Sequence, residues 1–337
     1  MTGPARLGSH SLPFVIDKLR TFADSYGRGG KPARYVVYGN VLVHEDRVHA
    51  DPTLVMRVLS HHRRMTKVEL PFTARMIFAT TNLRVVGLRG NDGLTAKVRL
   101  RGEKGLLWRE MAARRLLAAK LKRNEFVSVP EVRAYDRRDG LWLVEEFVEA
   151  THSNAADMAA FLSTGGIDLY RATARLRPVL RVRQSYERLA ADLRRLTPSA
   201  PAVADRSTWH VALCHGDFTK QNILRTSDGR FWLIDLEMAG VRPVAFDLAQ
   251  ACGEEPALVG HALAILESLG VGGDTLSATA QLALGLAAEL QERIRIRAGS
   301  IDDQVRLFGK SRQQAEAIVD GAFSRIVDLI RSLAATG

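Results

Sequence analysis

The predicted fold of this chain of 337 residues depends on residues 211–250, which read VALCHGDFTKQNILRTSDGRFWLIDLEMAGVRPVAFDLAQ. The runs VALCHGD and FWLIDLE are typical of short strands, and a turn at Thr226–Gly229 separates the apolar runs NIL and FWLI. Asp217 and Asn222 are five residues apart on the loop after the first strand, and Asp235 ends the second apolar run. The pattern predicts a loop that presents an acid and a carboxamide, with a further acid close to it.

These side chains suit phosphoryl transfer. That reaction needs a carboxylate to orient the attacking hydroxyl, oxygen ligands for Mg²⁺ and a cation on the nucleotide phosphates. Asp217 is predicted to accept or align the hydroxyl proton, while Asn222 and Asp235 are predicted to bind Mg²⁺. Glu237 points to the same side as Asp235 if the strand continues, so it either faces Mg²⁺ or the acceptor, or accepts a supporting hydrogen bond.

The segment before this site predicts a small sheet with one helix. The runs ARMIFAT, LRVVGLR and LTAKVRLR are separated by Thr81-Asn82 and by Gly90–Gly93, which predicts a three-stranded antiparallel meander. LLWREMAARRLLAAKLKR follows with leucines at helical spacing, and then comes the strand-like GLWLVEEFVE. Sheet, helix and sheet in this order are typical of the N-lobe of a kinase.

Three regions follow from these patterns. Residues 1–70 are predicted to form an N-terminal extension with a helix near Leu12–Tyr26, a strand-like VVYGNVLVH and a helix-like TLVMRVLSHHRRM. Residues 71–148 are predicted to form the nucleotide-binding N-lobe, and residues 149–337 a mainly helical C-lobe that carries the catalytic and acceptor-binding groups. The predicted fold class is α+β: a bilobal, protein-kinase-like fold with a small antiparallel-sheet N-lobe.

The central motifs resemble those of a known superfamily. HGDFTKQNIL, LIDLEMAG and AFDLA are similar to the signature of the aminoglycoside phosphotransferases and choline/ethanolamine kinases. The resemblance is close over residues 211–250 and diffuse elsewhere. It implies an ATP-dependent and Mg²⁺-dependent phosphotransferase in which Asp247 holds the catalytic loop. His215 and Glu237 are further candidates for supporting groups.

The same resemblance implies a nucleotide site in the N-lobe. Lys97 would bind the phosphates with Glu110 as its ion-pair partner, and residues 144–148, including Glu146 and Val148, would form the hinge that meets adenine. Thr81-Asn82 is similar to the Ser/Thr-Asn pair that choline-kinase-like enzymes place over the phosphates. The turn lacks the usual glycines, which leaves open how tightly its backbone closes on a triphosphate.

Composition narrows the possible partners. The net charge of +11 is concentrated in residues 1–200, which hold 35 Lys and Arg against 20 Asp and Glu. No compact basic run with interleaved aromatic residues occurs there, so nucleic-acid binding is not expected. The sequence predicts no transmembrane helix and no secretory signal, and a cytoplasmic location follows by default. Cys214 and Cys252 are predicted to be buried thiols.

The acceptor is predicted only by class. An amino alcohol, a sugar or a thiamine-like metabolite is preferred, and Pro256 after Glu254-Glu255 replaces the aromatic residue that choline-kinase-like proteins often carry. An anionic glycan or lipid-linked acceptor stays open because a run of arginines could form a positive surface or simply an exposed basic helix: Arg171, Arg175, Arg177, Arg181 and Arg183. A pseudokinase that binds nucleotide or a partner without catalysis is the alternative from another class.

Overall fold

A computed structural model gives the fold of the chain. The residues that it describes are 6–7, 10–27, 31–38, 40–46, 66–79, 82–88, 93–100, 106–122, 124–178, 191–196, 207–270, 274–308 and 310–336. The chain divides into two compact units. Unit 1 comprises residues 1–112 and 130–149, and unit 2 comprises residues 113–129 and 150–337.

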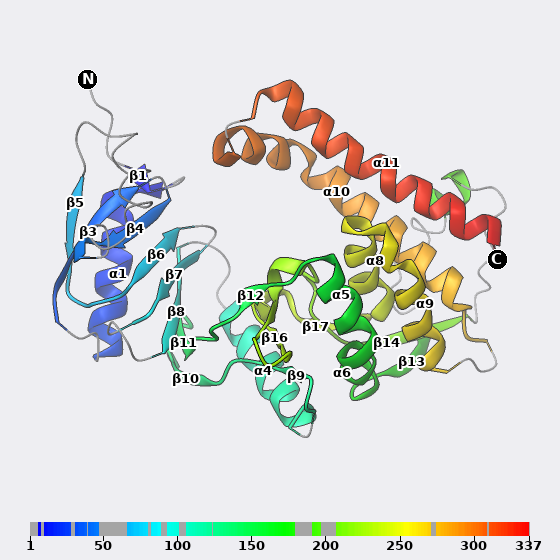
Figure 1. Cartoon of the computed structure of the whole chain (residues 1–337), viewed down its shortest axis with the longest axis horizontal. Coiled ribbons are helices and arrows are strands. Elements are labelled where there is room, and N and C mark those ends of the chain that lie inside the picture. Colours follow the sequence, from blue (N-terminus) through cyan, green and yellow to red (C-terminus); the bar gives the residue numbers. More distant parts are fainter. Residues whose placement is uncertain are drawn as a thin grey trace. The chain divides into compact units, whose positions relative to one another are not determined.

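Unit 1 is built on one eight-stranded sheet, which lies around the label β6 in Figure 1. Its strands follow the order β10-β11-β8-β7-β6-β4-β3-β5, and every neighbouring pair is antiparallel. Their bounds are β3 (Ala33–Tyr38), β4 (Val41–His44), β5 (Lys67–Leu70), β6 (Met76–Ala79), β7 (Asn82–Val86), β8 (Leu94–Arg99), β10 (Val132–Tyr135) and β11 (Trp142–Glu146). The predicted meander is confirmed as β6, β7 and β8.

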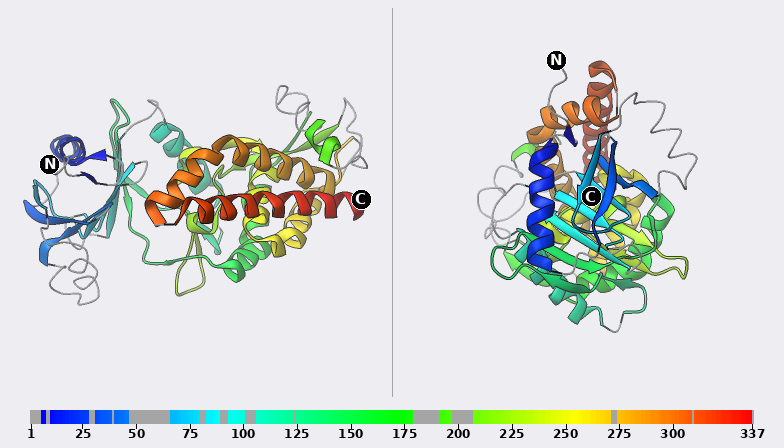
Figure 2. Two further views of the ribbon diagram at one scale, coloured as in Figure 1. Left: turned by 90° about the horizontal axis from the view of Figure 1, so that it is seen from above. Right: turned by 90° about the vertical axis from the view of Figure 1, so that its left-hand side faces the viewer.

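Helix α1 (Leu12–Tyr26) covers one face of this sheet (Figure 2). Its apolar residues recur at helical spacing, and Leu12, Val15, Leu19 and Phe22 join the sheet residues in one hydrophobic core. Gly27 ends the helix in the left-handed conformation with φ 64°. Two short strands, β1 (Arg6–Leu7) and β2 (His10–Ser11), pair before it.

The structure divides the N-terminal half differently from the sequence prediction. Residues 1–70 were predicted as an extension separate from residues 71–148, but β3, β4 and β5 pair into the same sheet as β6. Backbone pairing explains the difference, because β4 supplies the hydrogen-bonding edge on which β6 continues the sheet. The helix predicted within TLVMRVLSHHRRM lies outside the described residues.

Helix α4 (Leu106–Lys120) confirms the predicted helix, and the division between the units falls within it. Unit 2 then contains two small sheets. The first has the order β12-β15-β16-β9 and the second the order β13-β14-β17. Their bounds are β9 (Val127–Ser128), β12 (Thr151–His152), β13 (Arg175–Pro178), β14 (Thr208–Cys214), β15 (Ile223–Arg225), β16 (Phe231–Leu233) and β17 (Gly240–Pro243).

The rest of unit 2 is mainly helical. Its helices are α5 (Ala155–Phe161), α6 (Ile167–Arg171), α8 (Val244–Glu254), α9 (Val259–Ser268), α10 (Ala278–Phe308) and α11 (Arg312–Thr336), and residues 191–196 are also helical. One-turn helices occur at η1 (Leu162–Gly166), η3 (Lys220–Asn222), η4 (Leu236–Met238) and η5 (Pro256–Leu258). The long helices α10 and α11 run side by side (Figures 1 and 2).

This architecture confirms the predicted α+β class, with an antiparallel-sheet N-terminal region and a helical C-terminal region. Both cysteines are free and buried, and desolvation raises the pKa of Cys252 to about 12. Within the part of the chain that the structure describes, we find no helix with the length and apolar character required to cross a bilayer.

Candidate active site

The loop after β14 presents Asp217 to solvent and buries its neighbours. Asn222 donates its side-chain amide to Asp217 twice, at 2.8 Å to the carboxylate oxygen Oδ2 and at 2.9 Å to the backbone carbonyl. The carboxylate is therefore held in one orientation while it stays exposed. Since Nδ2 of Asn222 is used in this way, its Oδ1 is the atom that is left to act as a ligand.

Asp247, at the start of α8, fixes the backbone of this loop. Its two carboxylate oxygens accept hydrogen bonds from the backbone N–H groups of His215 at 2.6 Å and Gly216 at 2.9 Å. Asp247 is fully buried, and desolvation raises the pKa of its carboxyl although the neighbouring His215 and the two N–H groups oppose the shift. The predicted contact between Asp247 and the catalytic loop is present.

His215 links the loop to the strand that precedes Asp235. Its Nε2 donates to the carbonyl oxygen of Ile234 at 2.7 Å, so Nδ1 is the unprotonated atom that accepts from the backbone N–H of Asp217 at 3.3 Å. The backbone N–H of Ile234 in turn donates to the carbonyl of Asn222 at 3.0 Å. The two segments that carry the predicted metal ligands are thereby tied together.

Asp235 has an unusual backbone conformation. With φ 61° it is the one residue other than glycine with a positive φ in the described part of the chain. The expected continuation of the strand to Glu237 is wrong: β16 ends at Leu233, and Glu237 lies in the one-turn helix η4. The left-handed residue turns the chain so that carboxylate oxygens of Asp235 and Glu237 still lie within 4.8 Å of each other.

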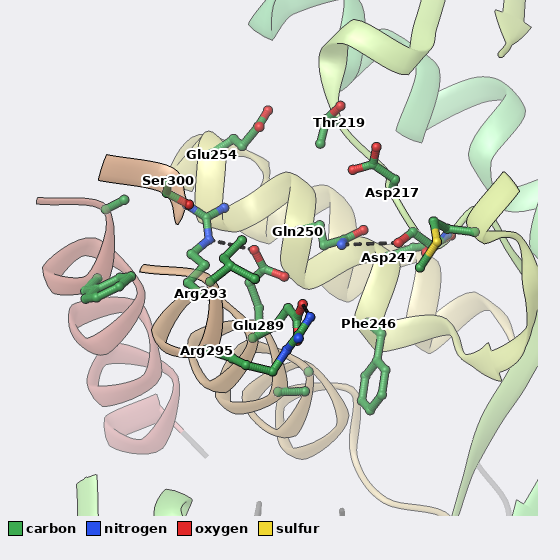
Figure 3. A pocket seen from close by; sticks show the side chains of 18 of the residues that line it. Asp217, Thr219, Phe246, Asp247, Gln250, Glu254, Glu289, Arg293, Arg295 and Ser300 are labelled. Carbon is green, nitrogen blue, oxygen red and sulfur yellow. Dashed lines mark hydrogen bonds and ion pairs between the residues drawn. The ribbon is translucent and has the colours of Figure 1, made fainter. Parts of the chain in front are cut away.

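A cavity of about 810 Å³ opens beside this loop (Figure 3). Asp217 and Thr219 reach it from the loop, Glu254 from the end of α8, and Glu289 and Arg293 from α10. Residues of α11, among them Val319 and Phe323, also line it. Desolvation raises the pKa of the Glu254 carboxyl, an effect that Lys220 and Arg293 oppose by their positive charge.

Two arginines of α10 that line the cavity have acidic partners on the same helix. Arg293 donates to Glu289 at 2.6 Å, and Arg295 is paired with Glu292. Arg242, on β17, donates instead to the backbone carbonyl of Met238 at 2.9 Å, beside Gly216. Neither Asp217 nor Glu254, which also line the cavity, takes part in these arginine contacts.

The predicted cofactor residues lie in unit 1. The ammonium group of Lys97 on β8 lies 3.1 Å from a carboxylate oxygen of Glu110 on α4, and both side chains are buried. Glu146 ends β11 and Val148 follows it, while Asn82 begins β7. Thr81 lies outside the described residues, as do Arg181 and Arg183.

Three side chains that hold the loop were missed in the sequence. Gln250 accepts the backbone N–H of Phe218 at 2.8 Å, Tyr170 donates to Asp247 at 3.2 Å, and Arg242 contacts the segment after Asp235. Gln250 lies three residues after Asp247 on one face of a helix, which is a signal that could have identified it. Tyr170 carries no local signal, because it is 77 residues from its partner.

Residues 96–282 match the model of the phosphotransferase enzyme family (APH), which is more than half of the chain. The chain belongs to the phosphotransferase enzyme family. The match includes the loop that carries Asp217, together with Asp235 and Asp247. Of the helices that line the cavity, it contains α8 and only the start of α10, and it ends before α11. This confirms the superfamily that the motifs indicated and supports phosphoryl transfer as the chemistry of the site.

Solved structures of this type are similar at low identity. A choline/ethanolamine kinase family protein from Mesorhizobium loti has 16% identity and a TM-score of 0.43 over 85% of this chain and 97% of that chain. The choline kinase LicA from Streptococcus pneumoniae has 15% identity and a TM-score of 0.46, with 75% and 91% covered. The macrolide 2'-phosphotransferase MphH from Brachybacterium faecium has 18% identity and a TM-score of 0.40, with 72% and 90% covered. No curated protein matches the chain in sequence.

Proposed function

We propose that this phosphotransferase transfers the terminal phosphoryl group of ATP to a hydroxyl group of a small molecule. The observation that carries the proposal is the placement of Asp217, whose carboxylate is oriented by Asn222 at 2.8 Å and lines a cavity of molecular size. Such a carboxylate can align the acceptor hydroxyl and take its proton as the oxygen attacks the phosphorus atom.

The donor set around this carboxylate fits Mg²⁺, a hard cation that prefers oxygen ligands. Oδ1 of Asn222 and the carboxylate of Asp235 are the atoms that would hold the ion, and Glu237 is close enough to Asp235 to support or join them. Bound Mg²⁺ would neutralise charge on the phosphate oxygens during transfer. For the nucleotide, Lys97 with its partner Glu110 supplies a buried cation, and the backbone at Glu146 and Val148 would meet the base.

The cavity supports a small polar acceptor such as an amino alcohol, a sugar or a thiamine-like metabolite. It is about as large as the sites that commonly enclose small ligands, and it combines an apolar wall with charged groups. Arg171, Arg175 and Arg177 are not among the described lining residues of this cavity, so these arginines give no support to an anionic glycan or lipid-linked acceptor here. The presence of Asp217, Asn222 and Asp235, the acids and the carboxamide that phosphoryl transfer needs, also favours a catalyst over a pseudokinase.

The test is acceptor-dependent ADP release by the purified protein with MgATP across amino alcohols, sugars, thiamine and aminoglycosides. Asp217→Asn is expected to lower kcat by about 100-fold to 10,000-fold with little change in ATP affinity, because only the proton acceptor is lost. Asp228→Asn, in the exposed turn after β15, is the matched control and is expected to keep full activity. Equal turnover by wild type and Asp217→Asn would refute the catalytic role.

A further inference from the structure

Strand β8 separates apolar and charged side chains onto opposite faces of the unit 1 sheet. Ala96 and Val98 belong to the hydrophobic core that α1 covers. Side chains alternate along a strand, so Thr95, Lys97 and Arg99 lie on the other face. This second face carries Arg99 as well as Lys97, the predicted phosphate-binding residue.

Arg99 is buried without compensation. Its side chain is only 6% exposed, and its Nη2 atom is fully enclosed with no hydrogen-bond partner among the described residues. The described part of the chain also provides no carboxylate within ion-pair distance of it, whereas Lys97 has Glu110 at 3.1 Å. A buried, unpaired guanidinium is costly to a fold, and such groups are retained where a ligand completes them.

The neighbours of Arg99 favour an anion as that ligand. The antiparallel register places Asn82 of β7 directly opposite Arg99, and Arg84 directly opposite Lys97. Cross-strand partners lie on the same face of a sheet, so an amide and three cationic side chains share it. Two buried carboxylates lie on this face as well, Glu110 beside Lys97 and Glu145 of β11 opposite Thr95, but neither forms an ion pair with Arg99 in the described structure.

We propose that Arg99 is a second phosphate-binding cation of the nucleotide site, acting beside Lys97; the proposal rests on the proposed use of ATP. Alternate residues on a strand are about 7 Å apart, so two such cations can contact neighbouring phosphoryl groups of one triphosphate. The guanidinium offers several N–H donors in a fixed plane, which suits phosphate oxygens. The side-chain donors of Arg99 would then supply contacts that the glycine-free sequence Ala79-Thr80-Thr81-Asn82 lacks.

The proposal is tested by calorimetric binding of MgATP and of adenosine to wild type, Arg99→Met and Arg99→Lys. Arg99→Met is expected to weaken ATP binding by about 10-fold to 100-fold and to leave adenosine binding unchanged, because only phosphate contacts are lost. Arg99→Lys keeps the positive charge, so its affinity for ATP is expected to lie between those of wild type and Arg99→Met. Arg133→Met, which removes a half-exposed arginine from β10 of the same sheet, is the matched control.

Thermal stability separates this role from a structural one. Removal of an unpaired buried charge is expected to leave the Tm of the nucleotide-free protein unchanged or raise it, whereas a structural arginine would lower it. An Arg99→Met variant with wild-type ATP affinity, or with equal loss of ATP and adenosine binding, overturns the assignment of Arg99 alone. If the wild-type protein binds adenosine and MgATP with equal affinity, the proposed use of ATP is overturned as well.

Discussion

Backbone conformation at single residues determines where the acids of this site lie. Gly216 has φ +81°, next to Asp217, and Asp235 has φ 61° at the end of the second strand. A left-handed conformation costs roughly 1–2 kcal/mol for a residue with a Cβ atom, so Asp235 is held there by its surroundings. Glycine avoids this cost at position 216, where space is also restricted, because a Cβ atom would overlap the carbonyl oxygen of Met238.

Gly216→Ala is therefore expected to impair both stability and turnover. The added methyl group meets the Met238 carbonyl carbon at 2.9 Å, and backbone cannot move aside as a flexible side chain can. We expect a loss of about 3 kcal/mol in the free energy of unfolding and at least a tenfold fall in kcat, measured by denaturant titration and ADP release.

Gly229→Ala is the matched control for this change. Gly229 has a similar φ of +86°, but nothing lies within 4 Å of an added Cβ atom. Its cost is expected to be the conformational one alone, about 1 kcal/mol, with unchanged kcat. Equal effects of the two substitutions would show that the contact with Met238 is unimportant.

The residues of the site were predictable where they follow one another closely in the sequence. Asp217 and Asn222 were expected on one loop, and the structure joins them by hydrogen bonds. The position of Glu237 was argued from a continuing strand, which the left-handed Asp235 interrupts. Tyr170 could not be predicted because its contact with Asp247 depends on packing across 77 residues. The catalytic and ligand roles themselves stay predictions.

At the scale of elements, close packing of α10 on α8 positions Asp247, the acid that holds the loop on which Asp217 lies. Gly285 of α10 faces Ala245 of α8, and an added Cβ atom would overlap the Ala245 carbonyl oxygen and lie 2.8 Å from its carbonyl carbon. Ala245 is two residues before Asp247. The spacing between the two helices therefore depends on a residue without a side chain.

Gly285→Ala is expected to destabilise the protein although alanine favours helix formation. The methyl group must push α10 away from α8, with an expected loss of about 1–3 kcal/mol in the free energy of unfolding. Gly299→Ala in the same helix has open space around the added atom, so it is expected to stabilise by about 0.5–1 kcal/mol. Urea denaturation measures both, and a stabilising Gly285→Ala would contradict the close packing.

Local patterns predicted several elements and the pairing within the meander β6-β7-β8, but not which other strand the meander joins. Alternating apolar residues identified β6, β7 and β8, and helical spacing identified α1 and α4 within a few residues. The run VVYGNVLVH was predicted as strand-like, but it forms parts of two strands, β3 and β4, which pair with each other. The spacing of apolar residues does not predict which strand edge a hairpin will join, because any exposed edge offers the same backbone donors and acceptors.

At the scale of the whole chain, the pairing of these strands changes the assignment of the first 70 residues, from a separate extension to part of the unit 1 sheet. Three of their strands complete the sheet that carries Lys97, and α1 covers its apolar face. Phe22 of α1 is 1% exposed, and its ring meets those of Phe72 and Trp142 at centroid distances of 5.8 and 5.7 Å. Trp142 also donates to Ser25 at 2.6 Å and begins the strand that leads to Glu146.

Phe22→Ala is accordingly expected to weaken nucleotide binding as well as stability. Loss of a buried phenyl ring should cost about 3–5 kcal/mol in the free energy of unfolding, and the loosened support of Trp142 should weaken ATP binding several-fold. Ile294→Ala, at a residue that is 56% exposed on α10, is the control and should change stability by less than about 0.5 kcal/mol. Denaturant titration and calorimetry at a temperature where both variants are folded give the two readouts. If residues 1–70 were a separate extension, Phe22→Ala would leave ATP affinity at the wild-type value; a parallel loss of stability and affinity would show that this segment belongs to the nucleotide-binding unit.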